Sequence, residues 1–314
     1  MTSRTLSVNY KSTNVRNMEH DGCRCPHLFT LMGRMAPGLT GNLVKRSFFA
    51  PAKPPVGASS RQFLTSGRRF QFRVHGKAIQ GWQWGRGPGI LFVHGWNSRG
   101  IYFSRFFKTL LESGYRIVTY YAPAHGESEG RLTNFFEMTD AVAAFFNQAV
   151  VPDIQEIVAH SLGAAAVINH LADRETDIET VLLAPAMQPG KILRQAFYQH
   201  GIPRTVSEKL ITDLEQQYGY SLLRHSPHLL AHRITSRVLI IHDRDDRITP
   251  YAESRRISEE RNQMVLHTTT GLGHKRLLND PEIVELVQAY LMERCQTDRF
   301  PASGFERRQA CNQT

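Results

Sequence analysis

The chain lacks a long hydrophobic run and contains few cysteines, and each shortage excludes a class of protein. No apolar segment approaches the roughly 20 residues that a transmembrane helix needs, which argues against an integral membrane protein. Only four cysteines occur in 314 residues, and a chain of this length can bury a stable core without disulfides. We therefore expect a cytoplasmic globular protein. The Cys23-Arg24-Cys25 pair also lacks the usual spacing of a zinc site.

Acidic residues are scarce near the N-terminus. The first 75 residues hold 12 lysines and arginines but only Glu19 and Asp21, which gives this segment a net charge of +10. The whole chain has 38 basic and 28 acidic residues, so the remainder carries 26 of each and is neutral. Because the charge excess belongs to the N-terminal segment and not to a folded surface, we do not expect nucleic acid as a partner.

Residues 1–60 are rich in Ser, Asn, Arg, Gly and Pro, and we expect a basic leader that is flexible or surface-associated. Within it, residues 28–49 carry scattered apolar side chains among basic ones. That segment can lie weakly on a membrane surface, pack as a helix against the body or form a frayed tail. A peripheral membrane location therefore stays open beside a cytoplasmic one, and the sequence does not indicate an oligomeric state.

From residue 69 onward, strand-like and helix-like patterns alternate. Arg69–Val74 and Ala78–Trp84 resemble two half-buried strands joined by a tight turn. Short continuous apolar runs, typical of strands buried on both faces, follow at residues 90–93, 117–121, 154–159, 181–183 and 238–241. Helical patterns separate these runs. The alternation predicts an α/β fold with a mostly parallel, doubly wound sheet.

A long insertion follows the strand that ends near Leu183. Residues 186–235 contain three amphipathic pieces, at Ile192–Tyr198, Val206–Tyr218 and Leu222–Ile234. A structureless loop of this length is improbable inside a compact domain, so we expect a helical cap.

The end of the folded region is marked by its last helix. Asp280 is suited to cap that helix, and Pro281 fits its first position. Residues 295–314 are polar and form a tail. We therefore expect one domain over residues 61–294, with the cap inserted in it.

The segment Ala159-His160-Ser161-Leu162-Gly163 directly follows a buried strand and opens a helical pattern. A serine on such a strand-to-helix turn projects its hydroxyl above the sheet, and small residues two before and two after it relieve crowding. The helix N-terminus behind it favours developing negative charge. Ser161 is therefore the candidate nucleophile, with His160 and Gly163 in support. Taken alone, the pattern also fits a turn in a non-hydrolytic nucleotide-binding fold.

Two further motifs accompany Ser161. His94-Gly95-Trp96 ends the strand at residues 90–93, and Gly271-Leu272-Gly273-His274 precedes the final helix. Between the serine and the last histidine, three aspartates follow the strand at residues 238–241, namely Asp243, Asp245 and Asp246. The chain order Ser, Asp, His is one of the orders in which Ser-His-Asp triads occur.

Together these motifs resemble the α/β-hydrolase superfamily, in particular its capped, esterase-like serine hydrolases, over about residues 69–294. The resemblance implies an α/β-hydrolase fold with Ser161 as nucleophile and His274 as general base. It also implies an oxyanion hole made by the backbone N–H groups of Trp96 and Leu162. We expect His94 to be a buried histidine that holds the loop containing Gly95.

The triad acid follows from a spacing that related hydrolases share. They resemble one another in placing it four residues before a proline, which fits Asp246 and Pro250, and Asp245 is the alternative. Two positions depart from the family pattern. Ala159 stands where the serine motif most often has Gly, and Tyr121 stands where the loop after the strand at residues 117–121 usually has Asp. Neither departure removes a catalytic group.

We expect a serine esterase or lipase-like enzyme that cleaves a small-molecule carboxylic ester through an acyl-enzyme, with no metal or organic cofactor. Thioesterase, lactonase, amidase and acyltransferase activities use the same triad, and a non-catalytic binding protein on this scaffold is a further alternative. His225, His228 and His232 in the insertion could form a one-sided metal site. No carboxylate or cysteine lies among them, so we expect ordinary polar roles.

Overall fold

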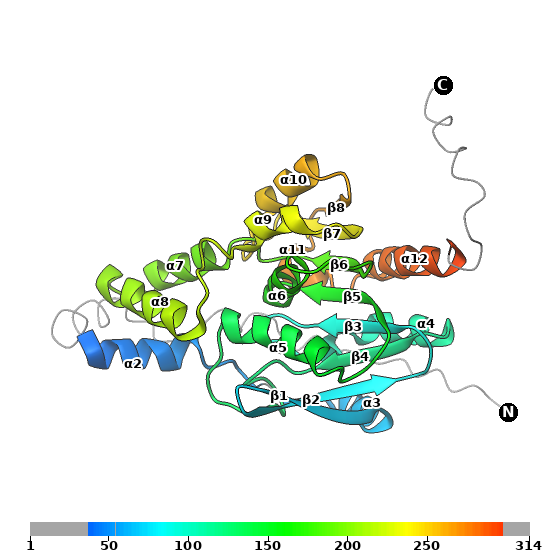
Figure 1. Cartoon of the computed structure of the whole chain (residues 1–314), viewed down its shortest axis with the longest axis horizontal. Helices are drawn as coiled ribbons and strands as arrows, with labels where there is room; N and C mark the ends of the chain where they lie inside the picture. The colour runs from blue at the N-terminus through cyan, green and yellow to red at the C-terminus, as the bar shows by residue number, and fades with distance from the viewer. Residues whose placement is uncertain (1–36, 54, 298–314) are drawn as a thin grey trace.

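Eight strands form one sheet in the computed structural model, which describes residues 37–53 and 55–297 (Figure 1). β1 pairs antiparallel with β2 and β2 with β4, whereas all other pairs in the order β1-β2-β4-β3-β5-β6-β7-β8 are parallel. The predicted mostly parallel sheet is thus confirmed. The strands are β1 (Arg68–Val74), β2 (Lys77–Trp84), β3 (Gly89–Val93), β4 (Arg116–Tyr120), β5 (Ile154–His160), β6 (Glu179–Leu183), β7 (Val238–Asp243) and β8 (Met264–Thr269).

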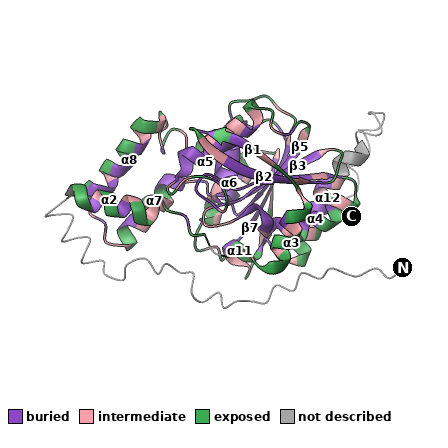
Figure 2. Ribbon diagram, turned by 90° about the horizontal axis from the view of Figure 1, so that it is seen from below, coloured by how far each residue is buried: buried purple, intermediate pink, exposed green. Residues whose placement is uncertain are grey.

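Helices cover both faces of the sheet, which explains the continuous apolar runs of its central strands. The covering helices are α5 (Phe135–Asn147) and α6 (Leu162–Leu171) on one face, with α4 (Ser104–Glu112) and α12 (Pro281–Thr297) on the other. Along β3, Leu91 and Val93 join the core cluster of the first face, whereas Ile90 and Phe92 join that of the second. Figure 2 shows buried residues gathered along the strands between these layers. A strand buried on both sides is expected to be apolar along most of its length.

The start of α12 follows its sequence signal. Asp280 Oδ1 accepts hydrogen bonds from the backbone N–H groups of Glu282 and Ile283, at 3.1 and 3.2 Å. Pro281 occupies the first helical position, where its missing N–H costs nothing. The predicted boundary is therefore confirmed. The other helices outside the insertion and the N-terminal segment are η2 (Gly100–Phe103), α10 (Tyr251–Glu260) and α11 (Gly273–Arg276).

The insertion between β6 and β7 begins with two helices that project beyond the sheet as a cap (Figure 1). They are α7 (Pro189–Gln199) and α8 (Arg204–Tyr218), and they match the first two amphipathic pieces. Phe197, Val206 and Leu210 lie in a third core cluster, which also contains Phe135 of α5 and Ala165 of α6. The cap thus packs its apolar side chains against the body.

The third amphipathic piece, predicted at Leu222–Ile234, is not a cap helix. It breaks at Pro227, where the short helix α9 (Pro227–Leu230) begins and runs into a 3-10 turn, η3 (Ala231–Arg233). A proline can start a helix but cannot lie in its interior, because it lacks the N–H group that the helix needs there. These residues pack on α6 in the core of the body. The cap is therefore smaller than the predicted range 186–235.

Part of the predicted leader is folded. The helix α2 (Pro37–Phe48) packs beside α8 in the cap (Figures 1 and 2). Its Val44 is fully buried, and Phe49, which follows the helix, is 6% exposed. A second helix, α3 (Ala58–Ser66), places Phe63 against Trp84 of β2. Of the three alternatives for residues 28–49, the described part adopts the packed helix.

Other parts of the predicted leader and tail lie outside the described residues. These are residues 1–36, with Cys23 and Cys25, residue 54, and residues 298–314, with Cys311. Among the helices that the structure does describe, none is long and apolar enough to cross a membrane.

Candidate active site

Ser161 occupies a sharp turn between β5 and α6. Its backbone has φ 55° and ψ −122°, a region that residues with a side chain rarely adopt. Hydrogen bonds hold this conformation: the Ser161 N–H donates to the Leu183 carbonyl at 3.0 Å, and the N–H groups of Ala165 and Ala186 donate to the Ser161 carbonyl, each at 3.1 Å. The turn is thus fixed by the neighbouring strand and by its own helix, as expected for a nucleophile at a strand end.

Two glycines let the turn after β3 approach Ser161 closely. A Cβ atom on Gly163 would lie 2.3 Å from the His94 carbonyl oxygen, and one on Gly95 would lie 2.8 Å from the Ser161 Cβ. Both distances are shorter than real contacts allow, so a side chain at either position would push the two turns apart. Gly95 and Gly163 therefore keep Trp96 and the first turn of α6 beside the serine.

Three residues far apart in the sequence form a continuous hydrogen-bonded chain. His274, on α11, has its Nε2 atom 2.8 Å from Ser161 Oγ and its Nδ1 atom 2.7 Å from Asp246 Oδ2. The arrangement fits a neutral imidazole that donates its Nδ1–H to Asp246 and accepts the hydroxyl proton of Ser161. All three side chains are buried, and that of Asp246 is completely so.

The Asp246 carboxylate is strongly stabilised in its charged form. Its Oδ1 accepts from the N–H groups of Ile248 and Thr249, at 2.8 and 3.0 Å, and its Oδ2 accepts from the Thr249 hydroxyl at 2.7 Å. His242 Nε2 lies 3.3 Å from the same Oδ2. Burial alone would raise the pKa of Asp246, but the hydrogen bonds from His242, His274 and Thr249 outweigh it and hold the pKa well below its usual range.

Asp243, the last residue of β7, and Asp245 form their hydrogen bonds with residues other than His274. Asp243 Oδ2 accepts from the Thr269 hydroxyl at 2.7 Å and from the Leu272 N–H at 2.9 Å. Asp245 Oδ2 accepts from the Gly271 N–H at 2.8 Å. Both carboxylates thus bind the loop that leads to His274. Burial would raise the pKa of Asp243, but these hydrogen bonds lower it on balance.

The candidate oxyanion groups, Trp96 and Leu162, line the same cavity as Ser161. Leu162 is the first residue of α6, and the first N–H groups of a helix have no acceptor within it. The Trp96 turn is held by His94, whose Nε2 accepts from the Ala122 N–H at 3.0 Å and whose Nδ1–H donates to the Gly95 carbonyl at 2.8 Å. Burial lowers the pKa of His94 to about 3, so it stays neutral.

Some supporting residues were not assigned a role from sequence. His125 Nε2 accepts from the Asn97 N–H at 3.2 Å, directly after Trp96. His242 and Thr249 surround the Asp246 carboxylate. The sequence signal for Thr249 was local. Thr249 lies three residues after Asp246, and this spacing of a hydroxyl residue and an aspartate is typical of a turn stabilised by side chains. The approach of His242 depends on how that turn folds, which the pattern does not specify.

The two departures from the family pattern are accommodated by packing. Ala159 is fully buried in β5. Tyr121 is also buried, with its ring centroid 4.7 Å from that of Trp82. A Cβ atom on Gly126 would lie 2.2 Å from the Tyr121 ring, so the glycine leaves the space that the ring fills.

A cavity of about 320 Å³ opens onto Ser161 between the body and the cap. Most of its lining is apolar and comes from α2, α5 and α7 and from the segments beside them: Phe48, Phe49, Phe135, Pro189, Ile192, Leu193, Ala196 and Leu222. Within residues 37–53 and 55–297, no Asp, Glu, Lys or Arg lines it. The site can therefore bring an apolar group to the serine hydroxyl.

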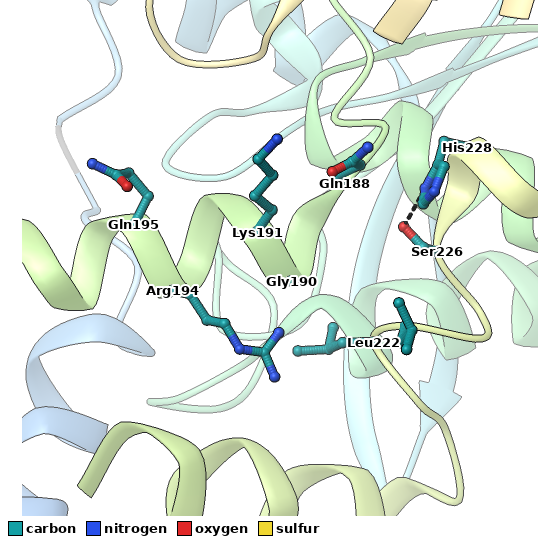
Figure 3. Close-up of a pocket in the computed structure, with 9 residues that line it drawn as sticks. Gln188, Gly190, Lys191, Arg194, Gln195, Leu222, Ser226 and His228 are labelled. Carbon is teal, nitrogen blue, oxygen red and sulfur yellow. Dashed lines mark hydrogen bonds between the residues drawn. The ribbon is translucent and has the colours of Figure 1, made fainter. Parts of the chain in front are cut away.

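A second cavity, of about 310 Å³, is more polar, and Ser161 is not among its lining residues (Figure 3). Lys191, Arg194 and Gln195 of α7 line it, whereas Ser161, Asp246 and His274 do not. The Arg194 guanidinium makes two hydrogen bonds of 3.1 Å to Glu208.

The three histidines considered as a metal site have separate partners. His225 Nδ1 accepts from the Ser221 N–H at 2.9 Å, and His228 Nδ1 lies 2.8 Å from the Ser226 hydroxyl (Figure 3). His232 Nε2 lies 3.2 Å from a Glu260 carboxylate oxygen. Each thus has the polar role expected for it.

Residues 90–289 match the alpha/beta hydrolase family, and because they make up more than half of the sequence, the chain belongs to that family. The sheet order and the cap agree with this assignment.

Among curated proteins, the chain is similar to the lysophosphatidylserine lipase ABHD12 of Danio rerio, with 23% identity over 226 residues. The match spans 65% of this chain and 58% of that protein's length. Among solved structures, the fold is similar to the esterase Pf2001 of Pyrococcus furiosus, with TM-score 0.58, 19% identity, and 78% and 97% of the two chains covered. It is also similar to Est1E of Butyrivibrio proteoclasticus bound to ferulic acid, with TM-score 0.57, 18% identity, and 73% and 100% covered.

Proposed function

We propose that this protein is a serine hydrolase that cleaves a small-molecule carboxylic ester through an acyl-enzyme. The observation that carries the proposal is the chain of short hydrogen bonds from Asp246 through His274 to Ser161. Ser161, at the end of this chain, lines an apolar cavity. A serine hydroxyl is a weak nucleophile, and an adjacent imidazole that is oriented by a carboxylate activates it. The names of the relatives, two esterases and a lipase, support an ester as the bond that is cleaved.

In the first half of the reaction, Ser161 Oγ attacks the ester carbonyl carbon while its proton moves to His274 Nε2. The carbonyl oxygen becomes an oxyanion, which the N–H groups of Trp96 and Leu162 stabilise. Each such donor typically contributes about 10²- to 10³-fold in rate, because it meets charge that develops only in the transition state. His274 then returns the proton to the departing alkoxide, so an alcohol leaves and an acyl-serine remains.

In the second half, water replaces the alcohol. His274 takes a proton from the water as its oxygen attacks the acyl carbon, and returns that proton to Ser161 Oγ as the bond to serine breaks. The products are a carboxylic acid and the free hydroxyl. Asp246 remains charged throughout and stabilises the imidazolium that forms twice in each cycle. Its lowered pKa suits this role.

Other acyl-transfer reactions can use the same groups, since thioesters, lactones and amides also pass through an oxyanion and an acyl-serine. The test is a panel of ester, thioester, lactone and amide substrates, with Ser161→Ala beside wild type. Esters should be cleaved with the highest kcat/KM. Ser161→Ala should retain at most about a hundredth of the wild-type turnover. If another substrate class has a higher kcat/KM, the bond that the enzyme cleaves is of that class and not an ester.

Labelling with a fluorophosphonate probe separates an enzyme from a binding protein on the same scaffold. The folded wild-type protein should be labelled at Ser161. Ser59→Ala is the matched control, because Ser59 is exposed on α3, and it should be labelled normally. Absence of labelling in folded wild-type protein would contradict the proposed nucleophile.

A further inference from the structure

We propose that the segment of residues 37–53, which comprises α2 and the five residues after it, is a wall of the substrate site that selects esters of extended apolar acyl chains. This inference rests on the proposed ester hydrolysis and adds the class of acyl group. The segment precedes the first strand of the sheet, yet Ser47, Phe48, Phe49 and Ala50 line the same cavity as Ser161. The N-terminal segment therefore forms part of the site.

The position of α2 is fixed by contacts with the cap. Val44 is fully buried in the cluster that contains Val206 and Leu210 of α8. The Phe48 ring lies edge-on to that of Phe197 on α7, with the centroids 4.8 Å apart. Edge-to-face pairs of this kind add to the free energy gained by burial. The cavity wall made by Phe48 is thus held against α7.

The residues after α2 form hydrogen bonds with the body at two points. The Thr133 N–H, just before α5, donates to the Phe49 carbonyl at 2.8 Å. The Ala52 N–H donates to the Asn97 side-chain oxygen at 2.8 Å, and Asn97 directly follows Trp96. The segment therefore connects the cap to the turn that carries a proposed oxyanion donor.

The lining of the cavity determines what it can hold. Ile192, Leu193 and Ala196 of α7 line it together with Phe48 and Phe49, and among the described residues no Asp, Glu, Lys or Arg does. Two of the polar lining groups are already engaged, because Asn134 accepts from the Glu137 N–H at 3.1 Å and Thr249 donates to Asp246. A group that fills this space thus gains more from apolar burial than from hydrogen bonds.

The size of the cavity excludes a very short acyl group as the best fit. Its volume of about 320 Å³ lies within the range of small-molecule sites, and an acetyl group would fill only a small part of it. Burying one more methylene changes an equilibrium or rate constant by about fourfold. The value of kcat/KM should therefore rise with each methylene until the space between α2 and α7 is full.

The experiment measures kcat/KM for p-nitrophenyl acetate, butyrate, hexanoate, octanoate, decanoate and laurate. Wild-type protein should show a rise of about fourfold per methylene and then a plateau or a fall. Two variants add bulk to the cavity lining on two different helices: Ser47→Phe on α2 and Ala196→Trp on α7. Each should lower kcat/KM for the longer esters by about 100-fold relative to kcat/KM for acetate.

Matched controls add the same bulk on the same helices outside the cavity. Asn42→Phe on α2 and Gln199→Trp on α7 replace exposed residues that do not line it. Both should keep the wild-type profile. Ser47 is exposed at the surface of α2, so Ser47→Phe should fold, and a thermal melt checks this for every variant.

The outcomes separate this inference from the proposed function. The proposed role of α2 is wrong if wild-type protein prefers acetate, or if folded Ser47→Phe keeps the wild-type acyl-chain profile. The proposed ester hydrolysis is not contradicted by either result. If Ala196→Trp alone shortens the profile, the acyl chain lies along α7 without α2, and the inference fails as well. If no ester is cleaved and Ser161 is not labelled by a fluorophosphonate, the proposed function itself fails.

Discussion

His160 donates a hydrogen bond from Nε2 to the backbone carbonyl of His274, at 3.0 Å, so the residue before the proposed nucleophile holds the helix that carries the proposed base. The two rings lie side by side, with centroids 4.7 Å apart. His160 is buried, and burial lowers its pKa to about 3. It therefore stays neutral beside a histidine that must accept a proton.

Removing this hydrogen bond should impair catalysis without unfolding the protein. In His160→Leu the His274 carbonyl loses its donor, and a displacement of the imidazole by a fraction of an ångström should lower kcat by about 10- to 100-fold. His160→Gln, which keeps a donor, should recover much of the loss. The check is kcat and KM for both variants together with their melting temperatures. Equal kcat in wild type and His160→Leu would show that the contact does not position His274.

The assignment of the acid can be tested by comparing two adjacent aspartates. Asp246→Asn should lower kcat by several orders of magnitude, because an amide favours the wrong imidazole tautomer, an effect of about 10⁴ in the chymotrypsin-type triad. Asp245→Asn should be mild, since its side-chain oxygen can still accept from the Gly271 N–H. Steady-state rates of the two variants decide the matter. The reverse order of effects would make Asp245 the acid.

Much of the architecture could be predicted from local patterns. The run Ile90 to Val93 had to be a strand buried on both faces, and Asp280-Pro281 had to start a helix, because burial and capping act within a few residues. Ser161 was identifiable because a strand, a small-residue turn and a helix follow one another directly. These predictions needed no knowledge of distant contacts.

The rest depends on contacts between residues far apart in the sequence. The sequence left three alternatives for residues 28–49, because an apolar face does not show which surface will bury it. The ring of Phe49 contacts that of Phe197, and nearly half the chain separates the two residues. The piece Leu222–Ile234 was assigned to the cap because its spacing is helical, whereas its last residues join the core of the body. Amphipathic spacing predicts a buried face but not its partner.

Buried neutral histidines should make the fold sensitive to acid. Burial lowers the pKa of His94 to about 3 and that of His125 to about 4, beside about 3 for His160, from an ordinary value of 6.5. Below pH 6.5 the unfolded chain therefore binds protons that the folded chain does not. The stability from these groups is fully present above pH 6.5 and is lost as the pH falls toward about 4.

Each of these histidines should contribute a slope of about 1.4 kcal/mol per pH unit well below pH 6.5. The measurement is urea unfolding at several pH values between neutral and mildly acidic. The free energy of unfolding should fall with pH, and His125→Gln should reduce the slope. A free energy of unfolding that is independent of pH in this range would show that these histidines titrate normally in the fold.

The N-terminal segment should contribute to stability as well as to the site. Phe49 is 6% exposed and Val44 is fully buried, so deletion of residues 1–53 would expose the apolar face of the cap that they cover. Replacing a buried phenylalanine with alanine typically costs about 3–5 kcal/mol. We therefore expect Phe49→Ala to lower the melting temperature clearly and the deletion to lower it further. If the segment does not stabilise the fold, Phe49→Ala and the deletion will both have the wild-type melting temperature.

Two controls locate the effect. Leu43→Ala removes an apolar side chain from the outer face of α2, where Leu43 is 44% exposed, and should change the free energy of unfolding by no more than about 0.5 kcal/mol. Deletion of residues 1–36 keeps all of α2 and should preserve both the melting temperature and the acyl-chain profile. The opposite result is that deletion of residues 1–53 gives a protein with the wild-type melting temperature and acyl-chain profile. That result would show that the contacts of Val44 and Phe49 do not hold the cap, because removing a segment that stabilises a site must change its stability or its specificity.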